Sequence, residues 1–345
     1  MLSEYRQDPI TKQWVILSPG RAKRPEAFVP KKTKKDKHKN CVFCEGNEKK
    51  TPKETYAIRK SDSKPDTPGW DIRVVPNKFP IFRKSASVKK IEENSFFDSL
   101  PAVGIHEVSI TNHPHKDLGQ LNLYKTQQVV ETYLQRFNFH KHNPFIPIRY
   151  MLIIHNHGKS SGASIPHPHS QILGFNHWEG SLIERELVGS RDYFFRNKKC
   201  VFCDMQEKEL RSRTRTIWGN NNFIAFCPYA SRYPFETWIM PRFHNGFFEY
   251  LKIDQMESFA EILRVVLAKM YKGLKNPDYN FYIHTSPTKF VSSRERDEVS
   301  RYYHWHVEIL PKITTWGGFE FGTNMIINVV SPEDAARFLK KIKVN

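Results

Sequence analysis

The chain has 345 residues, of which 39% are hydrophobic and 13% aromatic, so it can build one large folded domain or two ordinary ones. Its most apolar stretches, such as 150–154 and 262–267, are far shorter than the roughly 20 residues of a membrane-spanning helix. This composition excludes a helical membrane protein and a wholly disordered one. The first residues contain no apolar signal-like segment, so we expect a cytoplasmic protein.

Charge is the next constraint on function. Lysine and arginine number 54 against 36 aspartate and glutamate, which gives a net charge of +18. Such an excess suits an anionic partner: nucleic acid, an acidic surface or phosphorylated metabolites. The densest cationic run, Lys31–Lys39, lacks the interleaved aromatic or glycine residues of a nucleic-acid-binding arm. We therefore interpret it as a solvated loop.

Four short patterns occur twice along the chain, in the same order. In the first half they are CVFC at 41–44, HEVSITNHPH at 106–115, YMLIIH at 150–155 and HPHSQIL at 167–173. In the second half they are CVFC at 200–203, FETWIMPRFH at 235–244, YNFYIH at 279–284 and HWHVEIL at 304–310. Four matches in order indicate a duplicated module, with the halves at 1–180 and 181–345.

Hydrophobic periodicity predicts an α+β fold in each half. Alternating β-branched and aromatic residues predict strands at 105–111 and 281–284. Apolar residues at spacings of three and four predict helices over 123–137 and 255–274, and a Ser-Pro-Glu start predicts a third over 331–341. The cysteine pairs are expected in loops, and the polar stretch 288–301 in a mobile loop. The segment 175–196 is expected to join the halves.

The paired cysteines indicate metal sites, because C-x-x-C pairs in a cytosolic chain bind metals or do redox chemistry more often than they form disulfides. Structural zinc prefers four sulfur and nitrogen ligands. Each half supplies two cysteines and candidate histidines, with His113 an alternative to His115. The predicted ligand sets are Cys41, Cys44, His115 and His167, and Cys200, Cys203, His244 and His304. Zinc is the expected metal at the first site, while the second could hold another. Cys227 is expected to be a buried thiol.

The H-x-H pairs also indicate catalysis. Residues i and i+2 of a strand point to the same face, so His167 can hold a metal while His169 faces an adjacent pocket. The stretch 156–171 places glycines, serines and Lys159 just before this pair, and small residues let backbone N–H groups approach phosphate oxygens. A neutral imidazole beside such a cradle can attack phosphorus. We predict His169 as the nucleophile and Gln171 as a donor to a phosphate oxygen.

The motif HPHSQ after this loop, with CVFC upstream, resembles the galactose-1-phosphate uridylyltransferases of the histidine-triad superfamily. The resemblance covers nearly the whole chain, from DPITKQWVILSPGRAKRP through VVPNKFP to GGFEFGT. It implies two tandem histidine-triad-like modules with an antiparallel β-sheet and helices, the two metal sites, and a homodimer. It places catalysis at His169 and Gln171. The substrate contacts that it implies are Arg21, Arg24, Asn77, Phe79, Asn156, Gly162, Ser164, Phe319 and Glu320.

The resemblance also implies a ping-pong reaction. His169 takes the uridylyl group of UDP-glucose, and a hexose 1-phosphate then removes it, a reaction of galactose metabolism. The chain departs from the family where Ser170 stands in place of a frequent glycine, and where a second cysteine pair replaces a carboxylate-histidine metal site. Several of its motifs also resemble the ADP-glucose phosphorylase branch, which moves an adenylyl group to phosphate. The expected partners are therefore nucleotide sugars and sugar phosphates.

Two other functions compete with transfer. Hydrolysis of the nucleotidyl-histidine is less favoured, because Gln171 stands where hydrolytic relatives have a third histidine. A zinc-stabilised nucleic-acid-binding protein is suggested by the net charge and the cysteine pairs. It leaves the phosphate-binding loop and HPHSQ unexplained, so nucleic acid is not the expected partner.

Overall fold

A computed structural model describes residues 3–21, 41–84, 91–92, 97–113 and 116–344. Three expected features, Arg24, the cationic run Lys31–Lys39 and His115, lie outside these residues. Among the described residues, no helix has both the length and the apolar character needed to cross a membrane.

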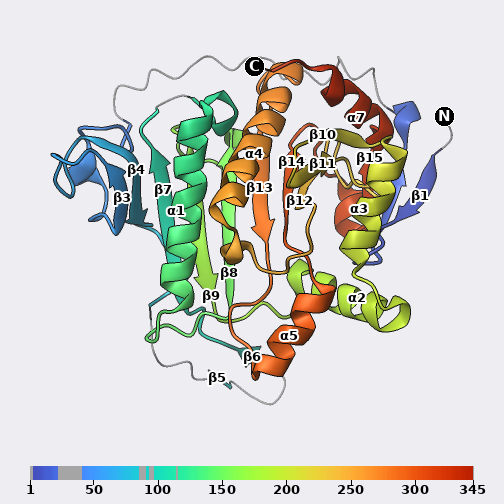
Figure 1. The fold of residues 1–345 in the computed structure, drawn as a ribbon, viewed down its shortest axis with the longest axis horizontal. Helices are drawn as coiled ribbons and strands as arrows, with labels where there is room; N and C mark the ends of the chain where they lie inside the picture. The colour runs from blue at the N-terminus through green and yellow to red at the C-terminus, as the bar shows by residue number, and fades with distance from the viewer. Residues whose placement is uncertain (1–2, 22–40, 85–90, 93–96, 114–115, 345) are drawn as a thin grey trace.

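The chain is built on one continuous antiparallel sheet of ten strands (Figure 1). Their order is β10-β11-β12-β14-β13-β8-β9-β7-β4-β3. The first half contributes β3 (Tyr56–Arg59), β4 (Trp70–Pro76), β7 (Gly104–Thr111), β8 (Tyr150–His157) and β9 (His169–Phe175). The second contributes β10 (Thr216–Gly219), β11 (Phe223–Phe226), β12 (Thr237–Pro241), β13 (Tyr279–His284) and β14 (His306–Pro311).

The strand order supports the duplication that the sequence predicts. The halves meet where β8 pairs with β13, with Phe281 opposite His155. Outward from this joint, each half has its YMLIIH or YNFYIH strand (β8, β13), then its H-x-H strand (β9, β14). The third strand of each half (β7, β12) comes from the HEVSITNHPH or FETWIMPRFH pattern. The two modules therefore share one sheet. The exact boundary at residue 180 remains a prediction.

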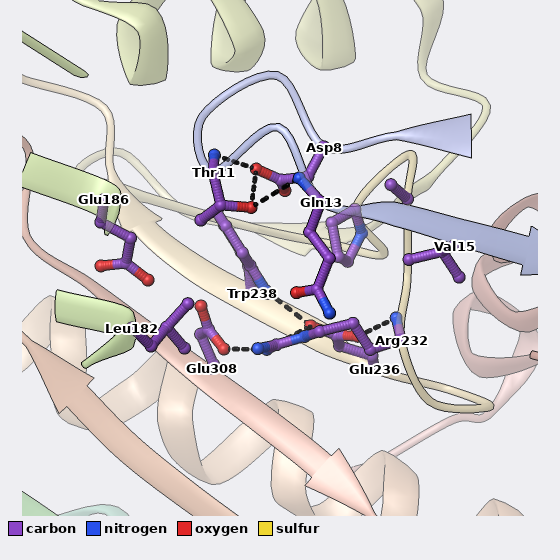
Figure 2. A pocket seen from close by; sticks show the side chains of 12 residues that line it. Asp8, Thr11, Gln13, Val15, Leu182, Glu186, Arg232, Glu236, Trp238 and Glu308 are labelled. Carbon is purple, nitrogen blue, oxygen red and sulfur yellow. Dashed lines mark hydrogen bonds and ion pairs between the residues drawn. The ribbon is translucent and has the colours of Figure 1, made fainter. Parts of the chain in front are cut away.

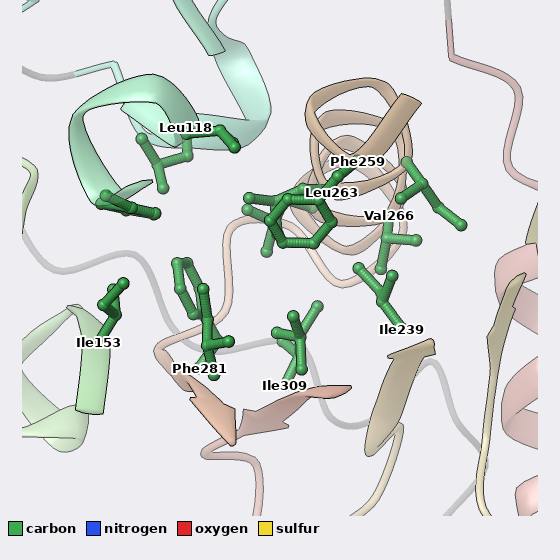
Figure 3. Close-up of a cluster of buried hydrophobic side chains, with 14 of the residues drawn as sticks. Leu118, Ile153, Ile239, Phe259, Leu263, Val266, Phe281 and Ile309 are labelled. Atoms are coloured by element: carbon green, nitrogen blue, oxygen red, sulfur yellow. The ribbon is translucent and has the colours of Figure 1, made fainter. Parts of the chain in front are cut away.

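Two long helices cover one face of the sheet (Figure 1). They are α1 (Leu123–Lys141) and α4 (Ile253–Gly273), and they pack side by side. Figure 3 shows Phe259, Leu263 and Val266 of α4 pointing toward strand residues such as Ile153 and Phe281. This spacing of four and three keeps the apolar residues on one helix face. The resulting core contains residues from both halves, which ties the modules together.

The remaining elements surround this body. The described segments contain five further helices: α2 (Leu182–Asn197), α3 (Val201–Ser212), α5 (Ser293–Tyr302), α6 (Gly318–Thr323) and α7 (Pro332–Lys341). A small sheet contains β1 (Glu4–Gln7), β2 (Trp14–Leu17) and β15 (Ile326–Asn328), and β5 (Ile91–Glu92) pairs with β6 (Asp98–Ser99). Short 3-10 turns are η1 (Pro19–Arg21), η3 (Glu48–Lys50), η4 (Leu118–Gln120), η5 (Lys159–Ser161) and η6 (Phe248–Tyr250).

All three predicted helices are present as α1, α4 and α7, and Ser331 caps α7 by accepting a hydrogen bond from the backbone N–H of Asp334. Two loop predictions are wrong. The stretch 288–301 contains α5, because the Ser292 side chain caps its first turn and Arg294 pairs with Glu298 one turn on. The second cysteine pair opens α3, with Cys200 at its N-cap and Cys203 in its first turn.

Candidate functional site

His169 is the first residue of β9, and it is held with one ring nitrogen pointing away from solvent. Its side chain lies under the ring of Phe43, and the residue is 8% exposed. Its Nδ1 lies 2.8 Å from the carbonyl oxygen of His167, so Nδ1–H donates and the lone pair remains on Nε2. Burial lowers the pKa of His169 to about 4. The imidazole is therefore neutral near pH 7 and suited to nucleophilic attack.

Gln171 follows on the same face of β9 and is fixed by His106 of β7. The backbone N–H of Ile81 donates to His106 Nδ1 (3.2 Å), so His106 carries its proton on Nε2. That Nε2 lies 2.7 Å from Gln171 Oε1 and donates to it. Because the amide oxygen is occupied, the amide NH₂ is the part left to contact a ligand. Burial lowers the pKa of His106, which keeps the ring neutral.

The side chain of Asn77 lies beside this group, with Nδ2 3.0 Å from His106 Nε2, but both nitrogens carry hydrogen atoms, so neither accepts from the other. The structure thus brings Asn77, His106 and Gln171 together. The sequence reasoning missed His106, although it is the first residue of the HEVSITNHPH pattern and its strand pairs with β9. Phe79 is 81% exposed, and only its backbone N–H joins this group, by donating to Asn77 Oδ1 (2.9 Å).

The loop before β9 is anchored from beneath by the second half of the chain. Asn280 of β13 donates to Asn156 Oδ1 (2.7 Å) and to the carbonyl oxygen of Ser161 (2.8 Å). Gly158 has a φ of +83°, and a Cβ there would lie 1.8 Å from Asp278 Oδ1. Glycine is therefore required at this position.

The upper side of the same loop is free for a ligand. Lys159, Gly162 and Ser164 are exposed. Asn156 lies one residue beyond the His155–Ser170 pair of β8 and β9, beside His169. Basic and small residues at such a position suit a phosphate cradle. The loop therefore lies beside His169, the predicted nucleophile, and its role as a phosphate cradle stays a prediction.

The first predicted metal site lies directly behind the nucleophile. Sγ of Cys41 and of Cys44 are 3.5 and 3.6 Å from His167 Nδ1. His167 Nε2 lies 2.7 Å from the carbonyl oxygen of Thr111, which orients Nδ1 toward the sulfur atoms. This donor set suits zinc. Of the two candidate fourth ligands, His115 lies outside the described residues, and His113 is not part of the described group, since it lies near Asp71 and Lys125.

The second predicted metal site is assembled from all four expected residues. The ligand atoms of Cys200, Cys203, His244 and His304 lie within 4.8 Å of one another. Cys203 Sγ is 3.2 Å from His244 Nδ1 and 3.6 Å from His304 Nδ1. The far nitrogens of the two histidines meet the carbonyl oxygens of Ser300 (2.6 Å) and Pro241 (3.1 Å). Two sulfur and two oriented nitrogen donors also suit zinc.

The second module contains His306 at the position that corresponds to His169, but other side chains bury its ring. His306 Nδ1 lies 3.1 Å from the carbonyl oxygen of His304, as His169 does from that of His167. However, His306 is fully buried, and the ring of Trp238 stacks on it at 4.7 Å. Glu308 stands where the first module has Gln171.

Figure 2 shows the pocket next to this closed site, where Arg232 lies between Glu236 and Glu308. Arg232 forms ion pairs with both carboxylates. His284 Nδ1, in turn, lies 2.9 Å from Glu186 Oε2. The cluster Glu186, His284, His306 and Glu308 has metal-type donors, but Arg232 already supplies a positive charge beside Glu308.

The other expected substrate residues do not meet His169 within this chain. Arg21 ends η1 beside the small sheet, where Ser18 N–H donates to the carbonyl oxygen of Asn328. Phe319 and Glu320 lie in α6, whose following residue Asn324 accepts from Gln13 of the N-terminal segment. Among the described contacts, none joins these residues to β9.

The fold and the site define a class of protein: an α+β protein of two tandem modules that share one antiparallel sheet, each with an H-x-H pair beside a cysteine-histidine cluster. Comparisons with known proteins agree. The family model "Galactose-1-phosphate uridyl transferase, N-terminal domain" matches residues 1–179. ADP-glucose phosphorylase of Arabidopsis thaliana is 32% identical, covering 99% of this chain and 93% of that protein. Galactose-1-phosphate uridylyltransferase of Thermotoga maritima is 28% identical, covering 99% of each.

A crystal structure of the Arabidopsis thaliana ADP-glucose phosphorylase with bound ADP-glucose has a TM-score of 0.81 and 31% identity. It covers 99% of this chain and 100% of that one. The chain belongs to the galactose-1-phosphate uridylyltransferase family, and it is an enzyme of this transferase type.

Proposed function

We propose that the protein transfers a nucleotidyl group through a covalent intermediate on His169. The observation that carries this proposal is the pair of contacts made by His167. Its ring nitrogen faces Cys41 and Cys44, while its carbonyl oxygen holds Nδ1–H of His169. The predicted zinc site thereby fixes the orientation of the nucleophile, with Nε2 as the reacting atom. Zinc at this site supplies rigidity.

The first half-reaction begins when His169 Nε2 attacks the α-phosphorus of a nucleotide diphosphate sugar. A P–N bond forms, and the P–O bond to the sugar phosphate breaks, so sugar 1-phosphate leaves. The imidazole becomes cationic and keeps its proton on Nδ1, which donates a hydrogen bond to the carbonyl oxygen of His167. In the second half-reaction, a phosphate oxygen of the acceptor attacks the same phosphorus. The P–N bond then breaks and restores neutral His169.

The surrounding residues stabilise charge on the phosphorus. The amide NH₂ of Gln171, oriented by His106, donates to a phosphoryl oxygen. The loop with Asn156, Gly162 and Ser164 contributes amide groups, and Lys159 adds a positive charge. We assign base and ribose contacts to Asn77 and Phe79.

We further propose that the remaining substrate residues act across a homodimer. Arg21, Phe319 and Glu320 lie away from His169 in their own chain. A partner copy can deliver them to the pocket, and we assign Arg24 to the same nucleotide-side group.

Two nucleotidyl donors, UDP-glucose and ADP-glucose, fit this mechanism, and a separate observation supports each of them. Uridylyl transfer from UDP-glucose to a hexose 1-phosphate, as in galactose metabolism, is supported by the family match over residues 1–179. Adenylyl transfer from ADP-glucose to phosphate is supported by the 32% identical phosphorylase.

Intact-mass spectrometry at mildly alkaline pH, where a phosphoramidate survives, tests both. The protein is incubated with UDP-glucose and ADP-glucose together, without acceptor. A uridylyl adduct supports the first assignment and an adenylyl adduct the second, and either must vanish in His169→Ala. No adduct on metal-replete protein would contradict covalent transfer.

A further inference from the structure

We propose that Asp117, His155 and His157 form a third divalent-metal site, on the helix-covered face of the sheet, opposite the face that carries His169. His155 and His157 are alternate residues of β8 and so point to the same face. Asp117 precedes η4, in the segment that follows β7. One ligand atom from each residue lies within 4.8 Å of the others.

The distances fit a shared ion as well as they fit weak direct hydrogen bonds. His155 Nε2 is 3.2 Å and His157 Nδ1 is 3.3 Å from the same oxygen, Asp117 Oδ1. Charge-assisted N–H···O hydrogen bonds are shorter, about 2.7–2.9 Å. Two atoms bound to one ion at about 2.1 Å with tetrahedral or octahedral angles are roughly 3.0–3.4 Å apart. The second predicted zinc site shows the same spacing, with 3.2 Å between Cys203 Sγ and His244 Nδ1.

Each candidate ligand is also held from behind, as metal ligands usually are. Nδ1 of His155 lies 3.0 Å from Ser170 Oγ, and Nε2 of His157 lies 2.8 Å from Asn276 Oδ1. The other oxygen of Asp117 accepts from the Tyr279 hydroxyl (2.7 Å). The Tyr279 ring also stacks on both imidazoles, which limits their rotation.

The charge of the site calls for a cation. Asp117 and His155 are buried, and a buried carboxylate needs a positive charge beside it. The site differs in this respect from the cluster around Glu308, where Arg232 is the counter-ion. His157 is 17% exposed at its side chain and provides a route of entry. Two imidazoles and one carboxylate suit Zn²⁺ or Fe²⁺.

The position of the site gives the ion a structural consequence. His157 is the last residue of β8, and Gly158 opens the loop that ends before the nucleophile. Ser170, which contacts His155, is the neighbour of His169. An ion on Asp117 therefore fixes the strand end from which the phosphate loop departs.

The test is metal content per chain after reconstitution with Zn²⁺ and removal of excess ion. His157→Gln is compared with the wild-type protein and with His142→Gln, a matched change at an exposed histidine. We expect His157→Gln to bind one equivalent fewer than the other two proteins. Asp117→Asn, which is nearly isosteric, is expected to lose the same equivalent.

Co²⁺ substitution distinguishes this site from the cysteine sites. The thiolate-to-cobalt charge-transfer bands are expected to be unchanged in His157→Gln, while visible bands of a nitrogen- and oxygen-ligated ion disappear. Equal metal content in wild type and His157→Gln, with identical cobalt spectra, would overturn the proposal and leave a hydrogen-bonded network. Because the readout is bound metal, it is independent of nucleotidyl transfer.

Discussion

The two modules place a histidine at the same position of the same strand pattern, but the surroundings of this histidine differ between them. His169 and His306 each lie two residues after a candidate zinc ligand, and each directs Nδ1 to that residue's carbonyl oxygen. Over His306 stand Trp238 and Phe202, and Glu308 follows it. Beside His169 lies the loop at 158–164, and Gln171 follows it. The fold orients both rings in the same way, whereas the residues around them differ, and this difference is why we propose that only His169 reacts.

The largest effect is expected from removing each histidine in turn. His169→Ala should lower transfer on the order of 10⁴-fold or more, because the covalent route is lost. His306→Gln should retain the nucleotidyl adduct, because it lies outside the reacting pocket. Steady-state rates and intact mass measure both, with circular dichroism to confirm folding. An adduct that persists in His169→Ala and vanishes in His306→Gln would reverse the comparison.

Substitution of Gln171, two positions after His169, is expected to have the next largest effect on the rate. Gln171→Glu makes the first module resemble the second, since it replaces an amide donor with a carboxylate beside the phosphate. We expect a loss of about 10²–10³-fold in kcat, the usual result of removing one transition-state donor. Retention of the wild-type rate would show that Gln171 does not contact the phosphoryl group. Gln135→Glu, a change at an exposed position of α1, serves as the control for an added charge.

His106 tests whether the amide must be oriented. His106→Ala frees Gln171 Oε1, so the amide can turn and donate less often to the phosphate. We expect kcat to fall by up to about 10²-fold with little change in KM, as for a misplaced catalytic group. His106→Asn should restore part of the rate if its amide can donate to Gln171. A change confined to KM would instead indicate a role in substrate binding.

The smallest effect is expected from pH. The pKa of His169 is about 4 because the ring is buried, so the free enzyme keeps a neutral nucleophile down to that value. In a plot of kcat/KM against pH, the contribution of His169 should therefore be constant from pH 7 to 5 and should fall below about pH 4. A fall centred near pH 6.5 would show that the ring is solvated.

The same shift has a consequence for stability. In the unfolded chain His169 binds a proton at the ordinary histidine pKa, near 6.5, whereas in the folded chain its pKa is about 4. The contribution of His169 to the free energy of unfolding is thus unaffected above that pH and declines as pH falls from 6.5 toward 4. Denaturant melts of wild type and His169→Gln over this range measure the difference.

Much of the architecture could be predicted from local patterns. The repeated motifs predicted the duplication, and apolar spacing predicted α1, α4 and α7 because each buries one face. The loop prediction at 288–301 failed because a mostly polar sequence forms a helix with a serine cap and an i,i+4 ion pair, and only Val299 and Tyr302 at its end are buried. The second cysteine pair was placed in a loop for a similar reason, since its helix start resembles a turn.

The sequence by itself determined which residues are the candidates for the chemistry. The C-x-x-C pairs, the H-x-H pairs and the glycine-rich loop are local, and strand geometry sets which neighbours share a face. Only the tertiary structure decided which of these groups meet. It brought His106 to Gln171, placed Trp238 over His306, and set Asp117 against His155 and His157. These contacts join segments far apart in the chain, and they depend on strand order and helix packing, which no local spacing encodes.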